Sequence, residues 1–198
     1  MQSSPKKLNQ ILTYRDYLLW PNNERWELID GIAYDMSPAP LREHQKLSMY
    51  FSGVFAQYFK KRNCNVYAAP FDVRLPGGFK TDNDVDTVVQ PDISVFCDET
   101  KLDDRGGNGA PDLVIEILSP STASKDLKEK FFLYEKVGVK EYWIVDPANR
   151  TLTVFILEEN EKYARGVVYA GEDVLITALF EGLEIRMEEV FESVSSSD

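Results

Sequence analysis

The sequence is poor in the residue types that build zinc clusters. Its 198 residues include one histidine and two cysteines, and Cys64 and Cys97 lie far apart in the chain without a CxxC pair. This usage gives no indication of a zinc site and is typical of proteins of the reducing cytosol. We therefore expect a cytoplasmic protein.

Long hydrophobic runs are missing as well. No stretch approaches the ~18 apolar residues of a membrane helix, and the start MQSSPKKLNQ lacks the apolar run of a secretory signal. The hydrophobic fraction of 43% is that of an ordinary globular protein. We expect no membrane partner and one domain over residues 13–192, between a polar arm (1–12) and a flexible tail (193–198).

Basic residues are in the minority, with 22 against 33 acidic residues and a net charge of −11. Such a protein gains little from counterion release at DNA phosphates, which argues against strong non-specific duplex binding but not against weak or metal-dependent binding. Residues 42–80 carry +5 and residues 82–104 carry −7. The basic stretch, including its KKR run at 60–62, is either a phosphate contact or a solvated helix end. We expect the acidic loop beside the functional site.

Periodicity and turn residues predict the elements. Helices are expected over 13–20, 41–62, 122–137 and 188–192, a hairpin over 26–36, and strands over 66–75, 88–96, 112–118, 141–146 and 151–159. The first long helix has an apolar stripe of Leu47, Phe51, Val54 and Tyr58. This order predicts an α/β or α+β fold with a mixed central sheet flanked by helices.

Two carboxylates interrupt apolar strands. Glu116 lies within PDLVIEILSPS and, by strand alternation, shares a face with Val114 and Leu118. Asp92 has similar neighbours in VVQPDISVF. Adjacent buried carboxylates repel each other unless a cation lies between them, and a hard divalent ion such as Mg²⁺ would serve. The ordinary alternative is that each faces solvent or pairs with a basic residue.

The helix after Glu116 supplies further polar residues. Asp126, Lys130 and Tyr134 are spaced four residues apart and fall on one face, with Leu127 expected on the same side. An inward Lys130 beside two carboxylates would hold a phosphate or orient the attacking water. The alternative is a lysine that extends to solvent or pairs with Asp126.

Two other residues are candidates by position. His44 lies three residues before Leu47, so it extends the apolar stripe and is expected to point inward. A single histidine on an apolar face is more often a core residue than a ligand or base. Glu27 lies in the first strand of the hairpin, and the pattern does not decide which way it points.

Together these motifs resemble the Uma2 family. The segments ERWELIDG, VVQPDISV, PDLVIEILSPST and GVKEYWIVDP, with His44 on the intervening helix, carry the resemblance over residues 13–192. It implies a restriction-endonuclease-like fold of the PD-(D/E)xK superfamily, in a family abundant in cyanobacteria. The superfamily places its lysine two residues after the second acid, where this chain has Leu118.

The resemblance assigns roles to residues that match the family motif. Asp92 and Glu116 would be metal ligands, and Lys130 would replace the lysine missing at position 118. Glu27 and His44 match further motif positions, and Tyr134 follows the lysine by one turn. The catalytic set is therefore Asp92, Glu116, Lys130, Glu27, His44 and Tyr134, with Asp92, Glu116 and Glu27 as the metal ligands.

The leading hypothesis is a Mg²⁺- or Mn²⁺-dependent endonuclease that hydrolyses DNA phosphodiester bonds. The competing hypothesis, favoured by Leu118 and the acidic C-terminal segment, is an inactive nuclease-derived module that binds nucleic acid or protein, and a third is an accessory protein of mobile elements. Nucleic acid is the expected partner. A homodimer would form if the strand over 151–157 lies at an exposed edge.

Overall fold

The structure, a computed structural model, describes residues 11–21, 24–36, 40–78, 81–120 and 123–192. Most of the predicted arm and the whole predicted tail, 193–198, lie outside these ranges. Leu12, at the end of the predicted arm, is nevertheless buried and donates its backbone N–H to Gly31 O at 3.0 Å.

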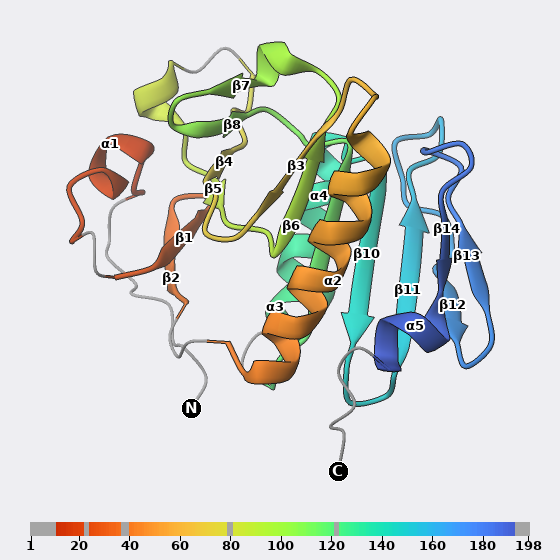
Figure 1. Ribbon diagram of the computed structural model, residues 1–198. Helices are drawn as coiled ribbons and strands as arrows, with labels where there is room; N and C mark the ends of the chain where they lie inside the picture. The colour runs from red at the N-terminus through yellow and green to blue at the C-terminus, as the bar shows by residue number, and fades with distance from the viewer. Residues whose placement is uncertain (1–10, 22–23, 37–39, 79–80, 121–122, 193–198) are drawn as a thin grey trace.

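Two six-stranded sheets and a hairpin form the fold (Figure 1). Sheet A has the order β2-β1-β5-β4-β8-β7 and sheet B the order β12-β11-β10-β9-β6-β3. Sheet A contains β1 (Trp26–Ile29), β2 (Ile32–Asp35), β4 (Val73–Arg74), β5 (Val88–Val89), β7 (Leu102–Asp103) and β8 (Gly106–Asn108). Sheet B contains β3 (Asn65–Ala68), β6 (Ile93–Phe96), β9 (Leu113–Ile117), β10 (Glu141–Asp146), β11 (Thr151–Ile156) and β12 (Val167–Ala170). The separate hairpin is β13 (Val174–Ile176) with β14 (Glu184–Arg186).

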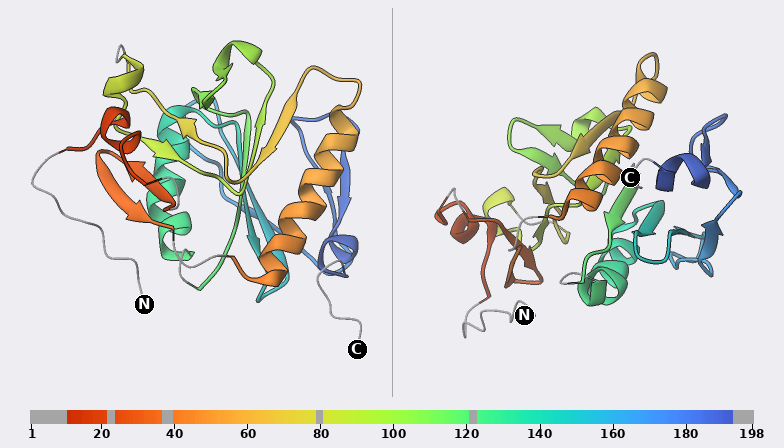
Figure 2. Two further views of the ribbon diagram at one scale, coloured as in Figure 1. Left: turned by 60° about the vertical axis from the view of Figure 1, so that its left-hand side comes forward. Right: turned by 60° about the horizontal axis from the view of Figure 1, so that its bottom comes forward.

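The helices cover sheet B on both faces (Figure 2). α2 (Arg42–Phe59) and α5 (Met187–Glu192) lie on one face, and α3 (Ala123–Lys125), a π-helical turn (Asp126–Lys130) and α4 (Phe131–Val137) lie on the other. The short helix α1 (Tyr14–Tyr17) packs against sheet A instead. Short 3₁₀ turns lie at Asp82–Asp84 and Glu99–Lys101. The mixed sheet flanked by helices confirms the predicted fold class, because β9 and β10 are parallel whereas β6 and β9 are antiparallel.

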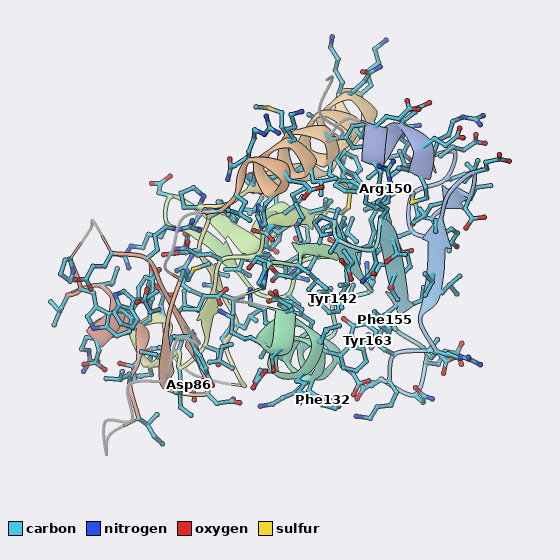
Figure 3. All side chains as sticks on the ribbon, turned by 90° about the horizontal axis from the view of Figure 1, so that it is seen from below. Asp86, Phe132, Tyr142, Arg150, Phe155 and Tyr163 are labelled. Carbon is cyan, nitrogen blue, oxygen red and sulfur yellow. A yellow bond between two sulfur atoms is a disulfide. The ribbon has the colours of Figure 1, made fainter. Side chains whose placement is uncertain are left out.

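Strand alternation divides the core between the two helical layers. The odd-numbered residues of β9 pack under α2, whereas Val114 packs with Leu133 and Tyr134 of α4. The buried stripe of α2 is Leu47, Phe51, Phe55 and Phe59. Its first two residues agree with the predicted stripe, and the last two are displaced by one position, because Val54 and Tyr58 lie at its margin. Beside α4, the rings of Tyr142, Phe155 and Tyr163 lie with centroids 6.2–6.3 Å apart (Figure 3).

Several boundaries differ from the sequence predictions. The predicted strands 66–75 and 88–96 each divide near a proline, Pro70 and Pro91, and contribute one strand to each sheet. The segment 102–108, expected to be a loop, contains β7 and β8. The predicted hairpin over 26–36 is confirmed and turns at Asp30-Gly31, and α4 ends with Gly138 in the left-handed conformation, so that φ is positive at all three residues.

The cysteines and the strand over 151–157 both have partners that the sequence did not indicate. Cys64 and Cys97 form a disulfide, because the antiparallel β3–β6 ladder places them just beyond the Asn65–Phe96 pair. The strand over 151–157 does not form an edge, since β11 pairs with β10 on one side and β12 on the other. Among the described segments, no helix is both long and apolar enough to cross a membrane.

Candidate active site

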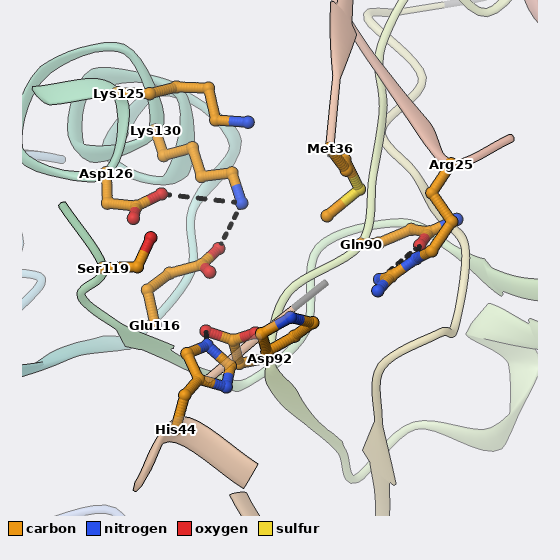
Figure 4. Close-up of a pocket in the computed structure, with 11 residues that line it drawn as sticks. Arg25, Met36, His44, Gln90, Asp92, Glu116, Ser119, Lys125, Asp126 and Lys130 are labelled. Carbon is orange, nitrogen blue, oxygen red and sulfur yellow. Dashed lines mark hydrogen bonds and ion pairs between the residues drawn. The ribbon is translucent and has the colours of Figure 1, made fainter. Parts of the chain in front are cut away.

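The candidate site lies where β6 begins and β9 ends. Ile93 pairs with Ile115 across the antiparallel ladder, so the residue before β6, Asp92, lies beside Glu116. The first turn of α2 brings His44 to the same place. A pocket of about 60 Å³ opens there, lined by Arg25, Met36, Pro40, His44, Gln90, Asp92, Glu116, Ser119, Lys125, Asp126 and Lys130 (Figure 4).

The Asp92 carboxylate is held through one of its two oxygens. Oδ2 lies 3.0 Å from His44 Nε2 and accepts a hydrogen bond from the backbone N–H of Ile117 at 2.8 Å. Within the described residues, Oδ1 has no hydrogen-bond partner. The side chain is 17% exposed, whereas His44 Nδ1 is buried and has no partner in the described structure. Asp92 therefore has one oxygen fixed by the protein and one available to a ligand.

Glu116 is held in the same way. Its Oε1 accepts hydrogen bonds from Lys130 Nζ at 2.7 Å and from the Tyr134 hydroxyl at 2.8 Å. In the part of the chain that the structure describes, Oε2 receives no hydrogen bond. Burial raises the pKa of Glu116 to about 8, and although Lys130 opposes this rise, nearby carboxylates add to it. The buried position of Glu116 therefore favours the protonated form of its carboxyl group more than an exposed position would.

Lys130 lies at the centre of the buried carboxylates. Its Nζ is 2.7 Å from Glu27 Oε1, 2.7 Å from Glu116 Oε1 and 3.7 Å from Asp126 Oδ1. Burial lowers the pKa of Lys130, but the charges of Glu116 and Glu27 outweigh it and raise the pKa well above its ordinary value. The ammonium is therefore charged at neutral pH, and it lies between Glu27 and Glu116, whereas the sequence analysis placed a divalent ion between Asp92 and Glu116.

Glu27 points inward and is fully buried. Its Oε2 accepts from Lys125 Nζ at 2.5 Å, and its Oε1 accepts the backbone N–H of Gln90 at 3.0 Å in addition to Lys130. Burial raises the pKa of Glu27, but the two lysines outweigh it and lower the pKa to about 2. Both oxygens are thus engaged by the protein, in contrast to those of Asp92 and Glu116.

The donor set fits a small hard cation better than a zinc ion. No group of three or more His, Cys, Asp or Glu side chains that could hold a metal ion is present in the described ranges. Two carboxylate oxygens nevertheless face one pocket, and Mg²⁺ is commonly held by one or two carboxylates while it keeps several waters. Asp92 and Glu116 are the residues that would hold it.

Comparison with known proteins assigns the chain to a family. The model of the Uma2 family, described as "Putative restriction endonuclease", matches residues 14–188. This chain belongs to the Uma2 family. A relative from Synechocystis sp. (strain ATCC 27184 / PCC 6803 / Kazusa), described as "Uncharacterized protein slr1290", is 30% identical over 133 residues. That match spans 66% of this chain and 66% of the relative, just under two-thirds of its length.

A solved structure shows the same fold. The crystal structure from Anabaena variabilis ATCC 29413, described as "a putative nuclease belonging to DUF820", has a TM-score of 0.74 and 21% sequence identity. The similarity covers 93% of this chain and 99% of the other. Membership in Uma2 therefore rests on the family match, and the shared architecture rests on this structure.

The lysine that contacts Glu116 comes from a helical turn and not from the strand. Leu118 occupies the strand position, and its side chain packs partly buried in the core against α4. Lys130 comes from the π-helical turn, together with Asp126, and both are 2% exposed. Leu127, expected on the same face, is 51% exposed. π-Helical turns occur frequently at functional sites, and here the turn aims two charged side chains at the pocket.

Six lining residues were not found from the sequence, and three of them, Arg25, Gln90 and Lys125, form hydrogen bonds or ion pairs at the pocket. Lys125 was expected to be solvated, but its side chain is only 14% exposed and pairs with Glu27. Gln90 is polar within an apolar strand, the same signal that identified Asp92, and could have been found by it. Arg25 lies in the ERWELIDG segment, but no pattern there indicates that its guanidinium binds Gln90 Oε1 at 2.8–3.1 Å.

Of the charged residues that the structure describes in the stretches 42–80 and 82–104, only Asp92 lines the pocket. The KKR run at 60–62 follows the C-terminal end of α2, about 25 Å from the pocket at the helix start if 1.5 Å is counted per residue. There Arg62 stacks on the ring of Tyr58, so the solvated helix end is the better description. In the acidic loop, Asp82 and Asp103 both bind the buried Arg74 at 2.6 Å, and neither lines the pocket.

Proposed function

We propose that this protein is a divalent-metal-dependent nuclease that hydrolyses phosphodiester bonds in DNA. One observation carries the proposal: Asp92 and Glu116 face one pocket, and each keeps one oxygen outside the described hydrogen bonds. Membership in a family described as "Putative restriction endonuclease" supports the same reaction class.

The pair of acids would bind Mg²⁺ or Mn²⁺. When bound, the ion would lower the pKa of a coordinated water and neutralise charge that develops on the phosphate. His44 would position Asp92, because its Nε2 contacts the oxygen that the backbone of Ile117 also holds. Tyr134 would do the same for Glu116 through its hydroxyl.

Lys130 would serve as a positioning cation and electrostatic stabiliser. It is only 2% exposed, yet it lines the pocket. Its ammonium contacts Glu116 Oε1 and also Glu27 Oε1, and each distance is 2.7 Å. A fixed buried cation stabilises developing negative charge more strongly than one in water, because the local dielectric is low. Glu27 would therefore keep Lys130 in place, and its contacts favour this role over that of a metal ligand.

Lys125 would make the phosphate contact that Lys130 is too buried to make. Its side chain lines the same pocket, and its ammonium approaches from the other side of Glu27. DNA binding would depend on this pocket and not on a broad basic surface, since the chain carries a net charge of −11. A homodimer would have to use an element other than β11.

The proposal is tested with purified protein, plasmid and linear DNA, and Mg²⁺ or Mn²⁺. Cleavage is expected with at least one metal, and Asp92→Asn and Glu116→Gln should abolish it. Asp104→Asn and Glu184→Gln, which change exposed acids outside the pocket, are matched controls that should cleave normally. Absence of cleavage by the wild type at high enzyme, or cleavage that persists in both pocket variants, contradicts the proposal.

A binding module without turnover is the second candidate. The observation that favours it is the Lys130 ammonium, which already lies between Glu27 and Glu116 at 2.7 Å from each. Isothermal titration with Mn²⁺ separates the two functions. A nuclease must bind the ion through Asp92 and Glu116, so both pocket variants should lose the binding heat. DNA binding without any metal binding would support the inactive module.

A further inference from the structure

A second hollow adjoins the candidate active site. This groove, of about 540 Å³, is lined by Tyr17, Leu18, Trp20, Pro21, Glu24, Arg25, Trp26, Pro70, Asp72 and Gln90. Arg25 and Gln90 also line the pocket of Asp92 and Glu116, so the two hollows meet at these residues. The pocket of about 60 Å³ has room for about two waters, whereas the groove falls in the range of small-molecule sites, about 300–1,000 Å³.

Aromatic rings form one wall of the groove. The ring centroids of Tyr17 and Trp20 are 5.2 Å apart, and those of Trp20 and Trp26 are 5.6 Å apart. Trp26 is fixed by a hydrogen bond from its Nε1 to Glu24 at 2.9 Å. Each of the three rings is only partly buried. All three rings line the groove, and partly exposed aromatic rings offer a surface on which a flat molecule can stack.

The polar groups of the groove determine which chemical class of flat molecule can bind there. Asp72 Oδ1 accepts from the Tyr17 hydroxyl at 2.8 Å and from Gln90 Nε2 at 2.9 Å, and no described residue contacts its Oδ2. Asp72 and Glu24 would repel a phosphate but would accept hydrogen bonds from the amino group of a nucleobase. The charge therefore favours a base within the groove and excludes a phosphate from it.

Positively charged side chains lie where the groove meets the pocket. The Arg25 guanidinium binds the Gln90 amide oxygen, and within the described ranges it forms no ion pair with a carboxylate. Lys125 lies on the other side of the pocket and forms an ion pair with Glu27. A nucleotide whose phosphate lies between these cations would have its base directed along Arg25 into the groove.

We propose that the groove is a stacking subsite for one unpaired nucleobase, next to the phosphate that occupies the pocket. The placement of that phosphate rests on the proposed function. A base within a duplex cannot enter the groove, because stacking on Trp20 and Trp26 requires its face to be free. The protein should therefore act on single-stranded or locally unpaired nucleic acid in preference to intact duplex.

The test measures base-dependent binding in EDTA, so that no cleavage occurs. The probes are a ten-nucleotide oligo(dC) and an abasic strand with the same number of phosphates. Trp143 is fully buried, whereas the other two tryptophans line the groove, so quenching of tryptophan fluorescence reports on the groove. We expect oligo(dC) to quench and to bind about 10-fold more tightly than the abasic strand.

Single substitutions test whether the groove causes the difference in affinity between the two strands. Trp20→Ala should lower the affinity for oligo(dC) about 10-fold and leave binding of the abasic strand unchanged, a pattern that general loss of folding would not give. Trp20→Phe should keep most of the affinity because a ring remains. Leu19→Ala is the matched control, since Leu19 is the next residue, is 82% exposed and does not line the groove. Equal binding of both strands, no binding of either, or identical affinities of Trp20→Ala and Leu19→Ala overturn the proposal.

The binding and cleavage experiments together distinguish failure of the subsite proposal from failure of the nuclease proposal. Base-dependent binding that requires Trp20, in a protein that cleaves no DNA with Mg²⁺ or Mn²⁺, would support the subsite while the nuclease proposal fails. Cleavage that depends on Asp92 and Glu116, combined with binding that ignores the bases, would support the nuclease and overturn the subsite.

Discussion

Arg74 and Lys130 are both buried cations that pair with carboxylates from other elements, but the acids around them differ. Arg74 donates to Asp82 and Asp103 at 2.6 Å and to the backbone oxygen of Gly107 at 3.2 Å. The side chains of its two acids are 34% and 45% exposed, so water also solvates them. The three acids around Lys130 have side chains at most 3% exposed.

This difference separates a structural ion cluster from a candidate reactive one. Around Arg74 one cation holds two half-solvated acids, which fastens the turn at Asp82–Asp84 to β7 and leaves little excess charge in the interior. Around Lys130 the acids outnumber the cation and open on a pocket, and the pKa of Glu116 rises to about 8. Strongly perturbed carboxylates in a pocket are typical of functional sites.

The largest expected effect on stability is that of Arg74→Met. Removing the cation loses the hydrogen bonds to Asp82 and Asp103, each worth about 1.5–3 kcal/mol, so the free energy of unfolding should fall by about 3–6 kcal/mol, as measured by urea denaturation. Arg105→Met is the control, because Arg105 is 57% exposed and lies 3.4 Å from Asp82; it should cost less than about 1 kcal/mol. Similar decreases in the free energy of unfolding for Arg74→Met and Arg105→Met would show that burial does not strengthen the ion pairs of Arg74.

Lys130→Met should act on the reaction. Loss of a preorganised positive group should reduce the rate of cleavage about 10²- to 10³-fold, in an assay corrected for the folded fraction. Lys136→Met removes a cation from the next helical segment, where its side chain is 70% exposed, and should cleave at the normal rate. Equal rates for the two variants would make the Lys130 cluster structural, like that of Arg74.

The pH dependence of stability should distinguish Glu116 from ordinary acids. The unfolded chain ionises it near the ordinary pKa of 4.5, whereas the folded chain keeps the proton until about pH 8. Between these values the unfolded state binds fewer protons, so the wild type should lose stability as pH rises. Glu116→Gln lacks this loss.

The difference in unfolding free energy between Glu116→Gln and the wild type should therefore grow from pH 4.5 to pH 8. It should reach a few kcal/mol, on the order of 1.4 kcal/mol for each unit of pKa shift. Urea denaturation in EDTA at several pH values measures it, with Glu184→Gln as the exposed control. A difference that stays constant across this range would show that Glu116 titrates normally.

The smallest effect is expected from His44→Ala. His44 holds only one oxygen of Asp92, and loss of a group that orients a metal ligand costs about 10- to 100-fold in metal affinity. Titration with Mn²⁺ measures the change. Gln45→Ala, at an exposed neighbouring position on α2, should bind Mn²⁺ as the wild type does. An unchanged affinity in His44→Ala would leave Asp92 positioned by the Ile117 amide alone.

Local patterns predicted the parts of the site that depend on the period of one element. Strand alternation placed Glu116 with Val114 on the face that α4 covers, and helical spacing placed Lys130 and Tyr134 on one face. These inferences need only the backbone geometry of a single strand or helix. The helix stripe was less exact, because the shift from Tyr58 to Phe59 depends on what α2 packs against.

Long-range pairing was not predictable in the same way. The division of 88–96 between two sheets, the disulfide of Cys64 with Cys97 and the inward turn of Glu27 all depend on which strands become neighbours. Sequence separation carries no information about such neighbours. The same holds for Lys125, whose ion pair with Glu27 joins residues that are far apart in the chain.

The sequence by itself determined the elements, their buried faces and the carboxylates on them, because hydrophobic period and turn residues act within a few residues of the chain. Only the tertiary structure decided that Lys130 lies between Glu27 and Glu116, and that an aromatic groove meets the same pocket at Arg25. The reason is physical: ion pairs and hollows form between segments that folding brings together, and their energies depend on burial that no local pattern fixes.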